Sequence, residues 1–325
     1  MTAVLTLLVS FAGSLLLLGL IIHLTRRFEV MAHPNARSSH TTATPTMGGV
    51  AIVIPIIAML GALTAQEDGV MLRLMLAVSF LAIVGFLDDL KSLNAGVRLF
   101  CQAVSVIVVL EGFGLPVSLF WLAIIGFLLL WHINLYNFMD GIDGIAAVQA
   151  LLFCVGVQLL AGGVQGQWGL LLWTISGATV GFLAFNWPPA RIFMGDVGAL
   201  VLGLTLGVIV VGLDQSGQLP FIASIILLSG FWFDASYTLC VRMLTGQAFT
   251  QAHRSHLCQR LSDRLGHLGA TSLFALVGVV WLLPLAWLSV AQPHWSIACL
   301  LLAPVPYLLG AVRLQAGVQL EAHER

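Results

Sequence analysis

Paired acidic residues mark the part of the sequence best suited to chemistry. Asp140 and Asp143 lie with Asn137 in the segment NFMDGIDGIA (137–146), between two runs that are apolar enough to enter a bilayer. Charged side chains are costly inside a membrane, about 2.5–3.5 kcal/mol each on insertion scales, and usually have a function there. If residues 140–146 begin a helix, both carboxylates share one face and could meet a ligand. Acids in a first helical turn are also favoured by the helix dipole, which is the simpler explanation.

Two more acidic motifs stand at the ends of apolar runs. Asp88 and Asp89 lie in GFLDDLKSLNAG (85–96), where adjacent carboxylates repel unless a cation shares them or one holds a proton. Asp196 lies in FNWPPARIFMGDVGAL (185–200), after a helix-breaking Pro-Pro pair. A carboxylate at that place could bind Mg²⁺, which takes one or two carboxylates plus substrate phosphates. Ordinary solvation of a helix end and a plain helix cap are the alternatives at these two sites.

A basic segment, AHRSHLCQRLSDRLGH (252–267), carries His253, Arg254 and His256. Such cationic groups suit phosphate oxygens, although a basic loop can also be attracted to anionic lipid. Together, the acidic and basic motifs indicate a cation site and a phosphate clamp on a lipid-facing scaffold. That combination points to transfer of a phosphorylated group from a soluble nucleotide donor to a lipid acceptor.

The elements that must position these residues are membrane helices. The chain has 325 residues, of which 59% are hydrophobic and 8% charged, whereas soluble domains carry roughly 25% charged residues. These values predict an all-α polytopic membrane protein, in which residues 1–325 form one integral-membrane domain that carries the transfer activity indicated by the motifs. A span needs about 20 apolar residues, which gives about 11 (10–11) spans. They are expected near 2–22, 48–65, 70–87, 98–114, 117–135, 144–162, 168–185, 197–213, 219–240, 270–291 and 296–312.

The distribution of charge predicts the orientation of the chain. Twelve of the 13 basic residues fall in alternate connections or in the tail, and Arg73 is the exception. The positive-inside rule makes that face cytoplasmic and places the N-terminus in the periplasm. The acidic motifs lie on the same face, so the active site is expected at the cytoplasmic face. The predicted cytoplasmic loops are about 23–47, 88–97, 136–143, 186–196 and 241–269.

Five motifs give the chain a family resemblance. PNARSSH with PTMGG (34–49), GFLDDLKS, NLYNFMDGIDG, FNWPPARIFMGDVG and HRSHLCQRL follow one another between about residues 26 and 268. In this order they resemble the polyprenyl-phosphate N-acetylhexosamine-1-phosphate transferases of glycosyltransferase family 4. The HRSH–QRL loop is most similar to the O-antigen-initiating branch and unlike the His-rich segment of the muramyl-pentapeptide branch. Ala32, Ala199 and Cys258 depart from the usual family pattern.

The resemblance implies an activity and its partners. Such enzymes transfer a sugar 1-phosphate, here of an N-acetylhexosamine or its 6-deoxy relative, from a UDP-sugar to undecaprenyl phosphate, and they release UMP. This step starts O-antigen or other cell-envelope glycan synthesis at the bacterial inner membrane. Mg²⁺ is the implied cofactor, with Mn²⁺ as a substitute. The implied partners are the lipid bilayer and a second copy in a homodimer, with no nucleic acid.

The resemblance also implies roles for individual residues. Asp88 would deprotonate or orient the lipid phosphate with Asp89 as its supporting partner, and Asp196 would bind Mg²⁺. The remaining implied substrate contacts are Asn137, Asp140 and Asp143 at the nucleotide end, Asn186 and Phe193 at the uridine, Arg37 in the PNARSSH motif, and His253, Arg254 and His256 over the diphosphate and sugar.

Two other interpretations stay open. One is a transferase similar to the UDP-MurNAc-pentapeptide translocase. The other, from a different class, is a secondary transporter, which would place ionisable residues near the middle of the membrane on broken helices. Asp234, inside the ninth predicted span, fits the transporter better than the other acids do, although a structural hydrogen bond would also explain it.

Overall fold

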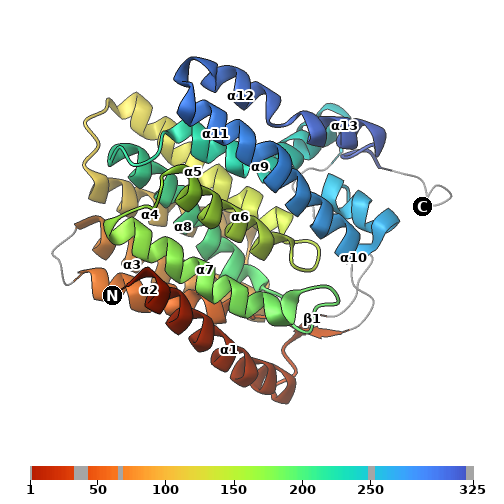
Figure 1. The fold of residues 1–325 in the computed structure, drawn as a ribbon. Helices are drawn as coiled ribbons and strands as arrows, with labels where there is room; N and C mark the ends of the chain where they lie inside the picture. Colours follow the sequence, from red (N-terminus) through yellow and green to blue (C-terminus); the bar gives the residue numbers. More distant parts are fainter. Residues whose placement is uncertain (1, 33–42, 65–68, 248–252, 320–325) are drawn as a thin grey trace.

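The computed structural model describes residues 2–32, 43–64, 69–247 and 253–319 as a bundle of helices (Figure 1). One short antiparallel pair of strands accompanies the helices, with Met31 opposite Pro45. In chain order the elements are α1 (Ala3–Arg27), β1 (Met31–Ala32), β2 (Thr44–Pro45), α2 (Val50–Thr64), α3 (Gly69–Leu90), α4 (Ala95–Phe113), α5 (Leu119–Met139), α6 (Ile145–Leu160), α7 (Gly166–Asn186), α8 (Gly195–Gln215), α9 (Phe221–Leu244), α10 (Leu257–Val277), a π-helical turn (Gly278–Leu282), α11 (Leu283–Ala291), a 3₁₀ turn (Pro293–Trp295), α12 (Ser296–Leu302) and α13 (Val305–Arg313).

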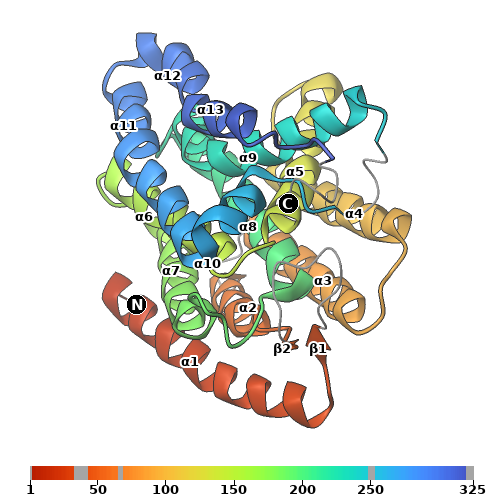
Figure 2. The same ribbon diagram turned by 90° about the vertical axis from the view of Figure 1, so that its right-hand side faces the viewer.

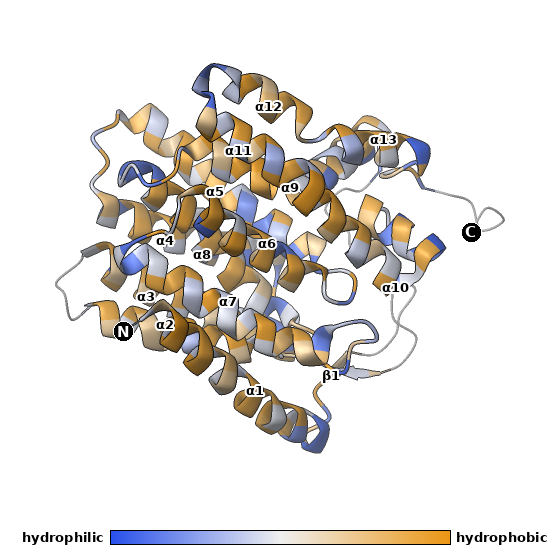
Figure 3. Ribbon diagram, viewed as in Figure 1, coloured by the Kyte–Doolittle hydropathy of each residue, from blue (hydrophilic) through white to orange (hydrophobic). Residues whose placement is uncertain are grey.

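The prediction of an all-α multi-pass membrane protein is confirmed. Within the described ranges, nine helical segments are long and apolar enough to cross a membrane, and the apolar helices α2 and α6 are shorter. Each of the eleven predicted spans falls on one of these segments. Hydrophobic residues cover the helices, and hydrophilic residues gather mainly at their ends (Figure 3).

The structure corrects the long predicted loop 241–269. Its second half is helical, because α10 begins at Leu257 and leads through the π-helical turn into α11 as one 35-residue segment. The prediction started this span at residue 270 because several charged side chains precede it. They lie on an amphipathic first part of α10, which is separated from the apolar part by a break at Gly266 (φ 70°, ψ 169°).

Helix α8 forms the centre of the bundle. Every residue from 197 to 210 is buried, and in Figure 2 the helix lies between α2 and α3 on one side and α5 and α9 on the other. Glycines bring the backbones close together, as is usual between membrane helices. A methyl group on Gly85 would lie 2.6 Å from the Cα of Val197, and one on Gly49 would lie 2.4 Å from the Cα of Gly198. These contacts fix the first turn of α8 against α2 and α3.

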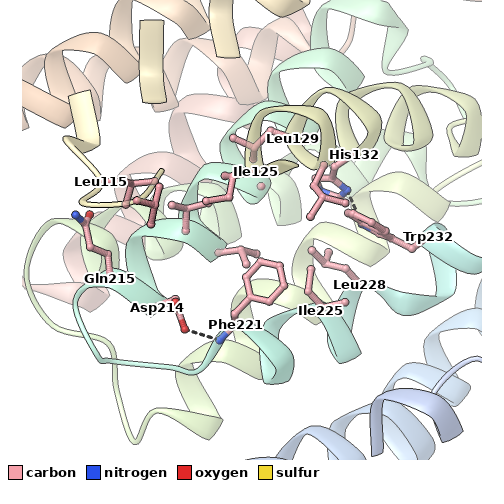
Figure 4. A pocket seen from close by; sticks show the side chains of 15 residues that line it. Leu115, Ile125, Leu129, His132, Asp214, Gln215, Phe221, Ile225, Leu228 and Trp232 are labelled. Atoms are coloured by element: carbon pink, nitrogen blue, oxygen red, sulfur yellow. Dashed lines mark hydrogen bonds between the residues drawn. The ribbon is translucent and has the colours of Figure 1, made fainter. Parts of the chain in front are cut away.

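An apolar cavity of about 200 Å³ lies between α5, α8 and α9 (Figure 4). Asp214 and Gln215 line it, so it is at the end of α8 opposite to Asp196. The other side chains around it are mostly aliphatic, with Phe221 and Trp232 among them. His132, which also lines the cavity, accepts a hydrogen bond at Nδ1 from the indole Nε1 of Trp232, at 2.9 Å.

Candidate active site

A polar cavity of about 350 Å³ lies at the N-terminal end of α8. It brings together the ends of α3, α5 and α7, the start of α8, and part of α10. Seven of the predicted site residues line it: Asp89, Asn137, Asp140, Asp143, Asn186, Phe193 and Asp196. The three acidic motifs, which are far apart in the sequence, therefore meet in one space.

Asp89 joins the end of α3 to the start of α8. Its Oδ1 accepts a hydrogen bond from the backbone N–H of Asp196 at 2.9 Å, and its Oδ2 accepts one from Val197 at 3.3 Å. These N–H groups belong to the first turn of α8, where helices lack internal partners. A methyl group on Gly195 would lie 2.5 Å from Asp89 Oδ2, so only glycine leaves room for this carboxylate. Asp89 thus caps α8 and holds Asp196 at the cavity.

Arg98, at the start of α4, connects Asp88, a predicted catalytic residue, to Asp196, the predicted metal ligand. Its Nη1 lies 2.7 Å from Oδ2 of Asp88 and 3.3 Å from Oδ2 of Asp196. The other oxygen of Asp88 accepts a hydrogen bond from the backbone N–H of Leu93 at 2.6 Å. Asp88 is almost fully buried and does not line the cavity itself. It reaches the site through the carboxyl group of Asp196, which lies beside its own, and through the guanidinium group of Arg98.

The Asp140–Asp143 pair lies in a turn rather than on a helix. The helix expected over 140–146 begins only at Ile145, because Gly144 takes a left-handed conformation (φ 76°). Both carboxylates still line the cavity. Burial, with the nearby charges of Asp89 and Asp143, raises the pKa of Asp140 well above its usual value. The turn therefore concentrates negative charge that a cation would relieve.

Asp143 is held by three residues from two distant segments. Its Oδ2 accepts a hydrogen bond from the backbone N–H of Ala190 at 3.0 Å, and its Oδ1 lies 3.0 Å from Nδ1 of His267. Its carbonyl oxygen accepts a hydrogen bond from the hydroxyl of Thr271 at 2.7 Å. These contacts attach the turn both to the loop before α8 and to α10.

Asn186 and Phe193 shape the wall of the cavity. The Asn186 side chain accepts a hydrogen bond from the N–H of Gly144 at 3.0 Å and donates one to the carbonyl of Ile192 at 2.9 Å. The backbone of Phe193 donates to the carbonyl of Pro45 at 2.8 Å. Asn186 therefore braces two loops, and its expected contact with a uridine stays a prediction.

The basic segment lies beside the cavity rather than in it. None of His253, Arg254 and His256 is among the residues that line the cavity. The rings of His253 and His256 stack with centroids 4.8 Å apart, and Arg254 forms an ion pair with Asp263. Burial, with the positive charge of neighbouring groups, lowers the pKa of His253 to about 3. His253 is therefore neutral at physiological pH, and its expected role over the diphosphate would have to be that of a hydrogen-bonding group.

Four polar residues of the site were not predicted: Arg98 beside the cavity, and Thr46, Gln259 and His267 in its lining. The sequence analysis used Arg98 only as one of the basic residues that set the orientation. Its position ten residues after Asp88, across one short turn, could have indicated that the two side chains meet. Gln259 and His267 line the cavity, and both lie in the basic segment whose other members were chosen. Arg37, which was predicted to bind substrate, lies outside the described residues.

Comparisons with known proteins bear on this arrangement. A model described as glycosyl transferase family 4 matches residues 71–214. The chain is 30% identical over 296 residues to the probable undecaprenyl-phosphate N-acetylglucosaminyl 1-phosphate transferase of Bacillus subtilis (strain 168), covering 84% of this chain and 82% of that protein. The chain belongs to glycosyl transferase family 4. It is also 31% identical over 229 residues to the phospho-N-acetylmuramoyl-pentapeptide-transferase of Streptococcus sanguinis (strain SK36), covering 62% of this chain and 69% of that relative.

The family match covers the acidic half of the site. It runs through nearly all of α3 to α8, so this glycosyl transferase family 4 protein has every aspartate of the polar cavity inside the matched residues. Gln259 and His267, which α10 brings to the same cavity, lie beyond the matched residues.

The donor set is compatible with one hard cation. Within the described ranges, no three His, Cys, Asp or Glu side chains are close enough to hold a metal ion by themselves. Mg²⁺ usually takes one or two carboxylates and completes its shell with water and substrate phosphates. Asp196, on the first turn of α8, and Asp140 both line the cavity and supply oxygen ligands of that type. The residues therefore fit Mg²⁺ bound together with a phosphorylated substrate.

Proposed function

We propose that this glycosyl transferase family 4 protein transfers a sugar 1-phosphate from a UDP-sugar to undecaprenyl phosphate and releases UMP. The observation that carries the proposal is the meeting of four aspartates from three separate motifs in one polar cavity at an end of an apolar bundle. A lipid acceptor can reach such a site from the bilayer, and a nucleotide donor can reach it from water. The name of the Bacillus subtilis relative supports a phosphorylated polyprenyl acceptor, and the names of both relatives support an N-acetylated amino-sugar donor.

Mg²⁺, or Mn²⁺ in its place, is the cofactor that we propose. Asp196 would bind it, and Asp140, which lines the same cavity, would be a further oxygen donor. When bound, the ion would neutralise phosphate oxygens and stabilise charge on the leaving UMP. Asp89 serves this site by holding the first turn of α8 in place.

The protein's own residues must bring two anionic phosphates together. Arg98 lies at the edge of the cavity between Asp88 and Asp196. Its guanidinium group could donate hydrogen bonds to a phosphate there as well. Asp88 would then orient the lipid phosphate or take its proton, and Asn137 would contact the nucleotide. The turn that carries Asp143 is held at this residue by Ala190 and Thr271, which keeps the cavity preorganised.

The donor is proposed to be a UDP-N-acetylhexosamine or its 6-deoxy relative, used to start O-antigen or another envelope glycan. The pentapeptide-linked muramyl donor is the second candidate, because the streptococcal relative is named for it. Secondary transport has less support. The acids converge at one end of the helices, and the one acid that fitted a transporter better, Asp234, forms structural hydrogen bonds.

We place the protein in the bacterial inner membrane, with the polar cavity at the cytoplasmic face and the N-terminus in the periplasm. A homodimer is part of this proposal. Reporter fusions after Lys91 or Asp143 should then report the cytoplasm, and a fusion at residues 213–218 should report the periplasm. A periplasmic reporter after Lys91 would separate the site from cytosolic nucleotides and contradict the proposal.

The activity can be tested directly with purified protein in detergent. Radiolabelled UDP-N-acetylglucosamine, its 6-deoxy relatives and UDP-MurNAc-pentapeptide are each incubated with undecaprenyl phosphate and Mg²⁺. We expect one N-acetylhexosamine donor to give a lipid-linked product and an equal amount of UMP, and we expect EDTA to stop the reaction. Product only from the pentapeptide donor would favour the second candidate, and no product from any donor would contradict the transferase assignment.

A further inference from the structure

Asp234 is a carboxylate in the interior of the bundle that the proposed reaction does not use. It lies on α9 and is fully buried. Its Oδ1 accepts a hydrogen bond from the backbone N–H of Leu257 at 2.7 Å, and its Oδ2 accepts one from Cys258 at 2.9 Å. The hydroxyl of Thr238 also donates to Oδ1, at 3.3 Å. Both oxygens are therefore engaged by donors that a carboxylate suits.

The two N–H groups are the first of α10. Helices leave their first N–H groups without internal partners, and an acidic or polar side chain just before the helix usually caps them. Here the residue at that position is His256, and its Nδ1 lies 3.6 Å from Asp234 Oδ1. The local capping contacts between His256 and Gln259 do not serve Leu257 and Cys258, so Asp234 provides the acceptors for these two N–H groups from a neighbouring helix.

Gln259 is the third residue of α10 and lines the polar cavity. Its Oε1 accepts a hydrogen bond from the N–H of His256 at 3.2 Å. This contact does not engage Nε2, the other end of the amide. A methyl group on Gly141 would lie 2.8 Å from that Nε2. The amide of Gln259 therefore lies against the glycine turn that carries Asp140 and Asp143.

We infer that Asp234 is a positioning residue: by capping α10 from α9, it holds Gln259 so that the side-chain amide faces the donor substrate in the polar cavity. The inference rests on the proposed function and adds a donor-binding residue to it. An amide N–H among carboxylates can donate to a sugar hydroxyl or to a phosphate oxygen, which the aspartates cannot do. Asn at position 234 could accept from only one of the two N–H groups, because its NH₂ end would face the other.

The position of α10 can be measured without any assay of activity. Cys258 is buried and follows directly after Leu257, so its alkylation by N-ethylmaleimide reports whether the first turn of α10 has opened. Cys101 and Cys240, the two cysteines that are not buried, are first replaced by serine. The variants are Asp234→Asn and, as a matched control, Thr238→Val, which removes a hydrogen bond to the same carboxylate but leaves both N–H contacts to α10.

We expect Asp234→Asn to speed the alkylation of Cys258 about tenfold or more, since loss of a helix cap costs about a factor of ten in local stability. Thr238→Val should leave it unchanged. A Cys258 that stays protected in Asp234→Asn would overturn the inference. So would an Asp234→Asn protein that no longer elutes as a folded species, because the carboxylate would then serve the whole fold rather than this turn.

The link to the donor is tested by a double-mutant cycle. Asp234→Asn and Gln259→Ala should each raise KM for the UDP-sugar about tenfold with a smaller change in kcat. The double variant should be no worse than Asp234→Asn alone, because the two changes remove one interaction. Additive losses would overturn the link. If the wild-type protein used no UDP-sugar at all, the proposed function would fail, whereas the alkylation of Cys258 would still decide whether Asp234 holds α10.

Discussion

The polar and the apolar cavity occupy opposite ends of the same central helix and have opposite chemistry. The polar cavity, of about 350 Å³, surrounds the first turn of α8, and the apolar cavity, of about 200 Å³, lies at the last turn. Both hold an aspartate of α8. Asp196 lies among other carboxylates and contacts Arg98 at 3.3 Å, whereas Asp214 accepts a hydrogen bond from the nearby N–H of Phe221 at 2.8 Å.

The difference shows which buried polar groups have a structural role and which indicate chemistry. At the apolar end, the partners of Asp214 and His132 both come from the adjoining helix α9. At the polar end, carboxylates from three segments far apart in sequence share one space and few donors. Such an excess of like charge is unfavourable unless a ligand relieves it. We therefore assign function to the polar end.

The two aspartates of α8, Asp196 and Asp214, should differ most when each is replaced by asparagine. Asp196→Asn keeps the shape of the side chain but removes its charge and its affinity for a cation, so transferase activity should fall at least about a hundredfold. Asp214→Asn can still accept the hydrogen bond of Phe221, so its activity should stay within about twofold of wild type. The measurement is kcat/KM with the best UDP-sugar. Similar losses in both variants, with both proteins folded, would abolish the contrast between the two ends.

Replacement of Arg98 should give the next largest effect. Arg98→Gln removes the cation that joins Asp88 to Asp196, and charged contacts of this kind are worth about 1.5–3 kcal/mol each. We expect kcat/KM to fall about ten- to a hundredfold.

Arg73→Gln is the matched control for this change. Arg73 pairs with Glu111 at 3.7 Å, and the Glu111 side chain is 70% exposed. Exposed pairs contribute about 0–1 kcal/mol, so neither activity nor stability should change measurably. Normal turnover in Arg98→Gln would remove Arg98 from the site and would leave the neighbouring Asp196 as the contact through which Asp88 acts.

The sequence was sufficient to predict the apolar framework and the acidic half of the site. Span length is set by the thickness of the bilayer, so the long apolar runs around Asp140 or Asp196 could be read without tertiary information. The motif aspartates are few in an apolar chain, which makes each of them informative. Their meeting in one cavity followed from their common side of the predicted membrane.

The contacts supplied by α10 could not be predicted in the same way. Gln259 is uncharged, and it reaches the cavity only because Asp234, on another helix, caps the turn before it. The break at Gly266 separates the two parts of α10 and is invisible in a hydropathy profile. Arg98 could be counted as a charge, but its position between two carboxylates depends on the packing of α3, α4 and α8. Tertiary contact, rather than local composition, decides these positions.

A methyl group added at Gly141 should give a smaller effect than the changes of charge. In Gly141→Ala the new methyl would meet Gln259 Nε2 at 2.8 Å, so the amide must shift away from the turn. We expect KM for the UDP-sugar to rise about three- to tenfold with little change in kcat. Gly61→Ala is the control, since its methyl would only touch the Sδ of Met75 at 3.7 Å. An unchanged KM in Gly141→Ala would show that Gln259 can move without affecting the donor.

The smallest effect is expected where the apolar cavity is partly filled. Val211 lines that cavity, and Val211→Leu adds one CH₂ group while replacing a β-branched residue by a better helix former. Extra dispersion contacts and higher helix propensity should together stabilise the protein by about 0.5 kcal/mol, which raises Tm by about 1–2 °C in a chain of this size. Thermal unfolding in detergent measures this gain. Activity should stay within about twofold of wild type, because the change lies at the end of α8 opposite to Asp196. A fall in kcat/KM of more than about fivefold in the stabilised variant would mean that the apolar end takes part in the reaction, and the division of the molecule into a chemical and a structural end would then be wrong.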